Sequence, residues 1–435
     1  MIDRLYKIYC FWRNHGSKSL IRLILIKLRL LRSPLQTAGH GLPIRNQVID
    51  EGSAHKLVAA RFEACSPLQA FSTPNLVGKK RISIVTDSIN SGSLYGGVGT
   101  AIIIAAHLAE AAKANLRVIT RTERAQPENL GLVLEIYGIQ LNEEVEFVFA
   151  PFYDKRTQID LLEGEQLITT SWWTTAATMA SVAHGSIIYL LQEDERMFYP
   201  HGDDHLRCTA AMQSKDIRYL INTRLLYDHL VSEGFSNVAE NGMWFEPAFP
   251  AEVFHPRAVP SKRKLRLFFY ARPNNLRNLF YFGIDLLDDA VTRGLIDLEQ
   301  WEILLVGKDI PKVVLGESYV PETYENLTWS EYAELIGNVD LGLSLMYTPH
   351  PSYPPLDLAA SGAIVVTNRF ANKRDLSVYS KNILCGDLNR ESMIETLAEG
   401  IRLASDQSKR RFNHEASALT RNWRTSTSEI VRCLV

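Results

Sequence analysis

Short, mainly apolar runs alternate with helical segments from Arg81 onward, and this alternation constrains the fold more than any other feature of the sequence. The first run, Arg81–Ile89, is followed by a Gly-rich turn and by Val98–Ala114, which is long enough for a helix. Buried strands separated by helices form parallel sheets that are covered on both faces. The sequence therefore predicts an α/β fold, with further strands in LRVITRT, VEFVFAP, QLITTSW, SIIYLLQ and DIRYLINT.

Four prolines crowd residues 247–260, and the alternation restarts after them with LRLFFYA, WEILLVG, VDLGLSLM and AIVVTN. We therefore expect two doubly wound Rossmann-like domains that face a central cleft. Ligands of open α/β sheets bind at the carboxyl ends of the strands, which makes this cleft the expected site. A last long helical stretch is expected over Arg390–Arg432. The expected parts are a basic N-terminal extension (1–80), the first domain (81–255), the second domain (256–405) and a C-terminal helix with the length to cross back onto the first (406–435).

Charge is distributed unevenly along the chain. The formal net charge is −2, yet Met1–Leu35 contains eight cations and one acid, a local net charge of +7. Within it, Leu20–Leu31 is apolar but interrupted by cations, so it predicts neither a membrane-spanning helix nor a signal peptide. Two interpretations remain, an interfacial helix on anionic lipid and a helix docked on the body of the protein or on a partner. A basic end on an acidic body indicates an anionic surface, and no nucleic acid, as partner.

Composition excludes several other classes of protein. With 46% hydrophobic and 22% charged residues, the 435-residue chain has the make-up of a soluble globular protein of two or three domains. Its five cysteines show no Cys-x-x-Cys spacing, which indicates neither a zinc site nor a disulfide framework and favours the cytosol. No Asp-x-Asp pair occurs, so a metal-bridged diphosphate site is unsupported.

A Gly-rich loop, Ser91–Thr100, joins the first predicted strand to the first predicted helix. Backbone N–H groups and the helix dipole bind anions at such a junction. Gly96 and Gly97, followed by Val98, let the backbone approach a ligand closely. The loop lacks the third glycine of a dinucleotide fingerprint and the Gly-Lys-Ser/Thr of a P-loop. The alternative interpretation is a tight turn that enters a helix.

Three consecutive acids, Glu193, Asp194 and Glu195, follow the strand predicted in SIIYLLQ. At the end of a sheet strand, their carboxylates are candidates for a base, an acid or acceptors of sugar hydroxyls. The acids of a solvated helix N-terminus give the same pattern. The aromatic residues, Pro200 and His201 that follow favour a carbohydrate pocket.

Arg272 and Arg277 flank a turn that follows the first strand of the second domain. Two planar guanidinium forks before a helix are suited to a diphosphate, whereas the alternative is an ordinary surface loop. Further on, Pro355 is expected to open a helix over Leu356–Ala360, with Asp357 in its first turn. There a carboxylate can accept the two hydroxyls of a ribose.

In this order, the four segments resemble the retaining family-four type of GT-B glycosyltransferase. Arg272 fits the arginine of that family's second-domain signature, with Arg277 in the lysine position and Asn278 in the glycine position. Asp357 matches the second of the family's two glutamates, whereas Pro349 stands where the first belongs.

The stretches ARPNNLRNLF, HPSYPPLDLA, GGVGT, TTSWWTT and the acids after YLLQ narrow the resemblance to the WsaF-type rhamnosyltransferases of surface-polysaccharide (rhamnan) synthesis. The resemblance implies a GT-B fold and transfer of L-rhamnose from dTDP-β-L-rhamnose to a growing glycan or lipid-linked glycan, with retention and without metal or other cofactor. Together with the basic segment, it indicates a cytoplasmic enzyme, peripheral at the inner face of the cell membrane. Alternatives are another nucleotide sugar as donor, a nucleotide-sugar 2-epimerase, and a catalytically silent scaffold subunit of a polysaccharide-assembly complex.

The site residues that the resemblance and the sequence pattern imply form three groups. Those expected in catalysis are Glu193, Glu195, Arg272 and Arg277. Those expected to bind the donor are Gly96, Gly97, Val98, Arg272, Arg277, Asn278, Gly307, Ser352, Tyr353 and Asp357. Those expected to bind the acceptor are Trp172, Trp173, Gln192, Asp194 and His201. The acids and the nucleotide clamp are expected on opposite sides of the ligand, because they belong to different domains.

Overall fold

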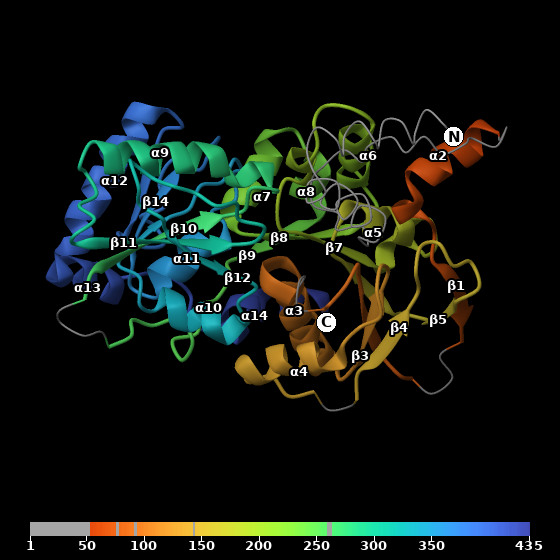
Figure 1. The fold of residues 1–435 in the computed structure, drawn as a ribbon. Coiled ribbons are helices and arrows are strands. Elements are labelled where there is room, and N and C mark those ends of the chain that lie inside the picture. Colours follow the sequence, from red (N-terminus) through yellow and green to blue (C-terminus); the bar gives the residue numbers. More distant parts are fainter. Residues whose placement is uncertain (1–52, 75–77, 91–93, 142–143, 259–262) are drawn as a thin grey trace, which may run out of the picture. The chain divides into compact units, whose positions relative to one another are not determined.

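The structure, a computed structural model, describes residues 53–435 except 75–77, 91–93, 142–143 and 259–262 (Figure 1). All described residues belong to one compact unit. The helix expected within Met1–Leu35 lies outside the described residues. Among the described helices, none combines the length and the apolar character needed to cross a membrane.

The first sheet has seven parallel strands in the order β4-β3-β2-β6-β7-β8-β9. Its central strands are runs of apolar residues buried on both faces, and Ile84 of β2 lies between Val118 of β3 and Ile168 of β6. The strands are β2 (Arg81–Thr86), β3 (Asn115–Thr120), β4 (Glu146–Phe149), β6 (Gln166–Thr169), β7 (Ile187–Leu191), β8 (Arg218–Asn222) and β9 (Gly242–Phe245). The helices between them are α3 (Gly99–Ala112), α4 (Pro127–Ile136), α5 (Trp172–Met179), α6 (Asp203–Met212), α7 (Arg224–Ser232) and α8 (Ser236–Asn241).

The second sheet has six parallel strands in the order β12-β11-β10-β13-β14-β15. The central strand β10 pairs with β11 on one side and with β13 on the other, which confirms a second parallel α/β layer. The strands are β10 (Leu265–Ala271), β11 (Trp301–Gly307), β12 (Glu322–Glu325), β13 (Leu341–Leu343), β14 (Ile364–Asn368) and β15 (Ile383–Gly386). The helices are α9 (Phe280–Thr292), α10 (Trp329–Ile336), α11 (Tyr353–Ala360), α12 (Arg390–Ser405) and α13 (Gln407–Glu415).

The long helical stretch predicted over Arg390–Arg432 is divided into α12, α13 and α14 (Trp423–Leu434). Polar side chains cause the breaks, because Asp406 and Asn422 accept hydrogen bonds from the free backbone N–H groups that begin the next helix. The last helix, α14, packs against α3 of the first sheet (Figure 1). Trp423, Ile430 and Leu434 enter the hydrophobic core there.

Part of the N-terminal extension is regular structure. Helix α2 (Ala54–Arg61) is followed by β1 (Gln69–Thr73), which pairs in parallel with β5 (Gln158–Leu162) as a separate two-stranded sheet. Leu68, Ile159 and Leu161 pack together with Val85, Ile119 and Leu167 of the seven-stranded sheet in one small core. Neither strand was predicted, because each is short and partly polar and the two lie far apart in the chain.

Candidate active site

Glu193 follows β7 at the carboxyl end of the first sheet, and it contacts residues of the second α/β region. Its Oε2 accepts a hydrogen bond from Arg277 Nη1 at 2.9 Å, and its Oε1 accepts one from the Thr348 hydroxyl. The side chain is buried, with 8% of the residue exposed. Burial raises the pKa of the Glu193 carboxyl, while Arg277, Thr348 and Lys373 act in the opposite direction.

Arg277 lies in a short turn, Leu276–Asn278, between β10 and α9. Its guanidinium stacks over the Phe198 ring, with Cζ 4.1 Å from the ring centroid. Burial lowers the pKa of Arg277, and Glu193 counteracts this. The acid and the arginine, expected on opposite sides of the ligand, thus form a mostly buried ion pair between the two α/β regions, with 19% of the Arg277 side chain and 11% of the Glu193 side chain exposed.

The other predicted arginine has a different environment. Arg272 follows β10, and its Nη1 donates to the hydroxyl of Tyr270 on the same strand at 3.1 Å. It is partly exposed. Arg277 and Arg272 are therefore unequal, since the first is committed to a buried carboxylate and the second to a neutral hydroxyl.

Two further groups beside the ion pair were not predicted. Lys373 is fully buried, its Nζ donates to the Met346 carbonyl at 3.2 Å, and burial lowers its pKa to about 8. His350 Nδ1 accepts a hydrogen bond from the Ser352 backbone N–H at 2.9 Å, which leaves the proton of the neutral ring on Nε2. Burial lowers the pKa of His350 to about 3, so the ring stays neutral.

The Nε2 of His350 is buried and has no hydrogen-bond partner among the described residues. Buried polar groups are nearly always paired, so an unpaired donor beside Arg277 and Lys373 is a candidate to bind a ligand. The only sequence signal for it was its place in HPSYPPLDLA, because a single histidine without spaced partners predicts no particular chemistry.

The Gly-rich loop belongs to a second network that also joins the two α/β regions. Gln192 Nε2 donates to the Gly97 carbonyl at 2.6 Å, and Asn222 Nδ2 contacts Gln192 Oε1 at 3.4 Å. The Tyr353 hydroxyl accepts from Asn222 Nδ2 at 2.9 Å and lies 2.5 Å from Thr100 Oγ1. A Cβ at Gly97 would lie 3.0 Å from Gln192 Nε2, so a larger residue there would require the Gln192 amide to shift. The structure thus brings the predicted residues Gly97, Gln192 and Tyr353 together.

The remaining Gly-rich residues shape the start of α3. Gly96 has φ +73°, a conformation that favours glycine, and its carbonyl accepts from the Thr100 hydroxyl at 3.0 Å. Val98 ends a π-helical turn, Leu94–Val98, and packs on the hydrophobic core between the first sheet, α3 and α14.

Asp357 lies in the second turn of α11, which corrects the prediction of the first turn. The helix begins at Tyr353, because Pro354 and Pro355 fit a first turn whose N–H groups need no intrahelical partner. The Tyr332 hydroxyl donates to Asp357 Oδ2 at 3.2 Å. Burial raises the pKa of the Asp357 carboxyl to about 8.

The two acids after Glu193 are bound within the first α/β region. Asp194 is fully buried and accepts from Arg196 Nε at 2.8 Å and Nη2 at 2.6 Å. Glu195 Oε2 accepts from the backbone N–H of Trp172 at 2.8 Å, at the start of α5, and burial raises the pKa of Glu195 to about 8. Both carboxylates therefore brace the segment that carries Glu193.

The two predicted tryptophans also donate to neighbours. Trp172 Nε1 donates to the Tyr199 hydroxyl at 2.9 Å, and Trp173 Nε1 donates to Asp87 Oδ2 at 2.9 Å. Asp87 follows β2 and was not predicted, although its place at a strand end was visible in RISIVTDSI. Burial raises its pKa. His201 is exposed, with its ring centroid 4.7 Å from that of His205.

Three other residues that were predicted to bind the donor occupy well-defined structural positions. Gly307 pairs with Ala271 in the β10–β11 ladder, where a Cβ would lie 1.8 Å from the Ala271 carbonyl oxygen. Ser352 precedes α11 with φ +71°. Asn278 is fully buried, and its Nδ2 lies 3.6 Å from Met346 Sδ. No cluster of three or more potential metal ligands occurs among the residues that the structure describes.

Two family models match the chain, the WsaF N-terminal domain over residues 81–223 and the WsaF C-terminal domain over residues 265–398. The O-antigen biosynthesis protein RfbC of Myxococcus xanthus is 27% identical over 279 residues, which are 62% of this chain and 20% of that protein. The chain thus spans about a fifth of that relative's length.

Solved glycosyltransferase structures share the fold. HepE of Anabaena in complex with UDP-glucose has a TM-score of 0.56 and 12% identity, covering 81% of this chain and 99% of that one. WaaG, a glycosyltransferase involved in lipopolysaccharide biosynthesis, has a TM-score of 0.54 and 9% identity with the same coverage. These likenesses confirm the two-domain GT-B architecture.

Proposed function

Because the chain belongs to the WsaF family of GT-B glycosyltransferases, we propose that it transfers L-rhamnose from dTDP-β-L-rhamnose to a growing surface polysaccharide, with retention of configuration and without a metal ion. The observation that carries the proposal is the buried cluster of Arg277, Lys373 and the unpaired His350 Nε2 at the carboxyl ends of the second sheet. The similarity to an O-antigen biosynthesis protein of Myxococcus xanthus supports a polysaccharide of the O-antigen kind as the product.

The cluster is suited to a departing nucleoside diphosphate. As the bond between C1 of the sugar and the diphosphate oxygen breaks, its electron pair moves onto the diphosphate. Preorganised positive charges and N–H donors in a site that excludes water stabilise such developing charge more than in bulk water. Arg277 presents a fork, Lys373 a buried ammonium and His350 a neutral donor, so the three supply what a metal ion supplies in other transferases.

The acceptor hydroxyl would form its bond to C1 on the face that the diphosphate leaves. We propose that its proton passes to the departing diphosphate oxygen, which keeps atoms and charge in balance without an enzyme nucleophile. Glu193 Oε2 accepts a hydrogen bond from Arg277 and Oε1 accepts one from Thr348, so in this proposal Glu193 positions Arg277. The same carboxylate also orients the acceptor hydroxyl. Asp357 and Tyr332 bind the ribose in this proposal, with Arg272 as a weaker contact to the diphosphate.

The test combines nucleotide binding with turnover. Thermal shifts are measured with dTDP, UDP, GDP and ADP, because a ligand that binds the native state raises apparent stability. Release of dTDP from dTDP-β-L-rhamnose is then measured with a rhamnan oligosaccharide, with and without EDTA, and the anomeric configuration is read by NMR.

We expect stabilisation by dTDP and turnover that EDTA leaves unchanged. Turnover with another nucleotide sugar in place of dTDP-rhamnose would overturn the donor assignment. Loss of turnover with EDTA would overturn the metal-free mechanism. Binding of no nucleotide at all would leave the scaffold-subunit alternative in place of an enzyme.

A further inference from the structure

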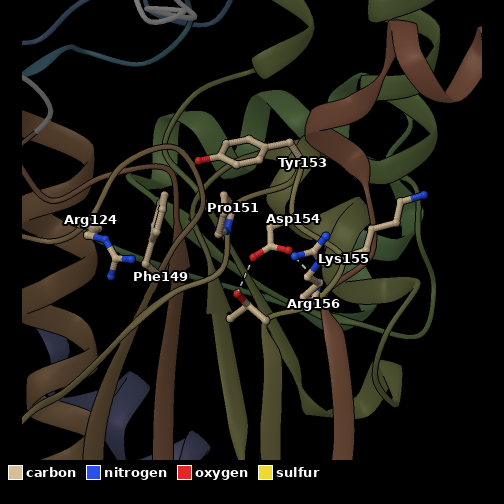
Figure 2. Close-up of a pocket in the computed structure, with 8 residues that line it drawn as sticks. Arg124, Phe149, Pro151, Tyr153, Asp154, Lys155 and Arg156 are labelled. Carbon is tan, nitrogen blue, oxygen red and sulfur yellow. Dashed lines mark hydrogen bonds between the residues drawn. The ribbon is translucent and has the colours of Figure 1, made fainter.

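A groove of about 620 Å³ lies beyond β4, at the edge of the first sheet and outside the site described above. Figure 2 shows the loop after the strand, with the Tyr153 ring at the mouth of the groove and Phe149 and Arg124 on one side. Tyr153 is 66% exposed, which is unusual for so large a ring. The Arg124 guanidinium stacks over the Phe149 ring, with Cζ 5.2 Å from its centroid.

Cations outnumber acids among the residues that line the groove. Three cations, Arg124, Lys155 and Arg156, face one acid, Asp154. That acid is already used within the loop, because Oδ1 accepts from the Arg156 backbone N–H at 2.8 Å and Oδ2 from the Thr157 hydroxyl at 2.9 Å. These bonds, first that of the Arg156 N–H, lower the pKa of Asp154. The positive charge of Arg156 acts in the same direction. Among the described residues, the guanidinium groups of Arg124 and Arg156 donate no hydrogen bond, so their N–H groups can bind a ligand that offers acceptors.

From these observations we infer that the groove binds an anionic group, a phosphate or a carboxylate, on the acceptor glycan. Guanidinium forks match both groups in geometry, and an exposed tyrosine provides a flat face for an adjoining sugar ring. Lys155 extends away from Phe149 in Figure 2, so Arg124 and Arg156 are the groups that we assign to the anion. The identification of the ligand as the acceptor rests on the proposed function.

The position of the groove fits an acceptor that reaches the active site. All strands of the sheet are parallel, so the carboxyl ends of the strands lie together. The loop after β4 is therefore at the same end of the sheet as Asp87 after β2 and Glu193 after β7. Four strand spacings separate β4 from β7, which is roughly 19 Å at about 4.8 Å per spacing. The groove would therefore hold a part of the glycan several sugar units away from the reacting hydroxyl.

The experiment measures binding of three oligosaccharides of equal length to the full chain by titration calorimetry. One carries a phosphate monoester, one a glucuronate and one no charge. We expect the charged compounds to bind roughly tenfold more tightly than the neutral one, with the difference closing at about 1 M salt as the charges are screened. A preference for the phosphate identifies a phosphorylated carrier or glycan as the source, and a preference for the glucuronate identifies an acidic sugar.

Variants locate the binding to the groove. Arg124→Ala and Arg156→Ala are each expected to weaken binding of the charged compounds roughly three- to tenfold. Lys215→Ala is the matched control. It removes one exposed cation that precedes β8, at the amino ends of the strands of the same sheet, whereas the groove follows the carboxyl end of β4. Tyr153→Ala is expected to weaken binding of all three compounds.

The inference is overturned if the neutral and charged compounds bind alike, if none of them binds, or if Lys215→Ala weakens binding as much as Arg156→Ala. Titration of dTDP into the same samples separates this result from the proposed function. Binding of the charged compounds without binding of dTDP would keep the groove and reject the proposed donor. Binding of dTDP without binding of the charged compounds would reject the groove and keep the proposed donor.

Discussion

Arg277 and Glu193 are 84 residues apart in the sequence, yet Arg277 Nη1 donates to Glu193 Oε2 at 2.9 Å across the junction of the two α/β regions. Removing one member of a buried pair leaves the other charge uncompensated. If Arg277 binds the diphosphate, as we propose, the ligand and Glu193 would compete for the Nη1 donor that Glu193 accepts from. The contact links donor binding to the position of the acid that we assign to the acceptor.

Glu193→Gln tests this competition. The amide keeps the shape of the side chain but removes its charge, so Arg277 is released toward the diphosphate. We expect dTDP affinity to rise a few-fold while turnover falls, because the acid is lost from the acceptor side. Calorimetry and initial rates measure the two effects separately. Weaker dTDP binding in a folded variant would contradict the competition and make Glu193 a group that supports the donor directly.

The two arginines are predicted to differ in their effects. A charge-assisted hydrogen bond contributes roughly 1.5–3 kcal/mol, so losing the fork in Arg277→Lys is expected to weaken dTDP binding about 10- to 150-fold. The lysine retains a charge for Glu193, which limits the loss of stability. Arg272→Ala is expected to have a smaller effect, because Arg272 donates to the neutral hydroxyl of Tyr270 and not to a carboxylate. Equal losses in both variants would show that the two act as one clamp.

Much of the fold was predictable from local pattern. Strand β7, IIYLL, is buried at every position, and such runs identify central parallel strands without further information. The end of β6 was misjudged, since QLITTSW was expected to be extended through Trp172. Ser171 and Thr174 instead form a capping box that begins α5 at Trp172. The edge strand β12, ETYE, was missed because its polar, exposed residues carry no apolar signal.

The candidate site was predictable only in part. Residues next to a strand end, such as Glu193 and Arg277, were identified because topology places strand ends at one edge. Lys373 was not, because nothing in its local sequence indicates that it is buried beside Glu193. The contact between Glu193 and Arg277 likewise depends on how the two α/β regions pack, which no local pattern encodes.

His350 is predicted to act through its Nε2–H. In His350→Gln the side-chain amide reaches the position of Nε2 and preserves a donor there, whereas in His350→Asn the shorter amide reaches only the position of Nδ1. We expect the Gln variant to retain much of the turnover and the Asn variant to lose turnover roughly 10- to 100-fold. The loss typically seen when one donor to a developing oxyanion is removed is somewhat larger. Initial rates over pH 6 to 9 check the protonation state at the same time.

A neutral donor with a pKa of about 3 does not titrate in that range, so His350→Gln should leave the shape of the pH–rate profile unchanged. If Asn and Gln lose turnover equally while both variants bind dTDP normally, the donor is not used. A change in profile shape in the Gln variant would show that the imidazole is ionised during the reaction.

Asp357 makes stability depend on pH. Its pKa is about 8 in the folded chain and ordinarily 3.8, so between these values the folded state keeps a proton that the unfolded state has lost. The free energy of unfolding therefore falls as pH rises from about 4 to about 8, and is flat above. Asp357→Asn removes this contribution and should reduce the slope. Urea denaturation at several pH values measures it, and an identical slope in the variant would contradict the buried, protonated carboxyl.

The segment Met1–Leu35, with its net charge of +7, is predicted to bind anionic membranes. Each cation near an anionic surface contributes about 1 kcal/mol, and its apolar residues add to this if they insert. Replacing Arg22, Arg29 and Arg32 with Gln should thus weaken binding to anionic vesicles by about two orders of magnitude. Co-sedimentation of the full chain with anionic and with neutral vesicles, at low and high salt, measures the effect.

The control for this experiment replaces three exposed lysines of the folded body, Lys215, Lys381 and Lys409, with Gln. It changes the net charge of the chain by the same amount, so a purely global electrostatic attraction predicts equal losses in the two variants. Attraction localised in the basic segment predicts a loss only in the first, because salt screens charges beyond about 10 Å at 0.1 M. Equal binding to neutral and anionic vesicles would instead favour the second interpretation of the segment, a helix docked on the protein or on a partner. A membrane-bound enzyme would meet a lipid-linked acceptor at high local concentration, so membrane binding by the basic segment is predicted to raise turnover with such an acceptor.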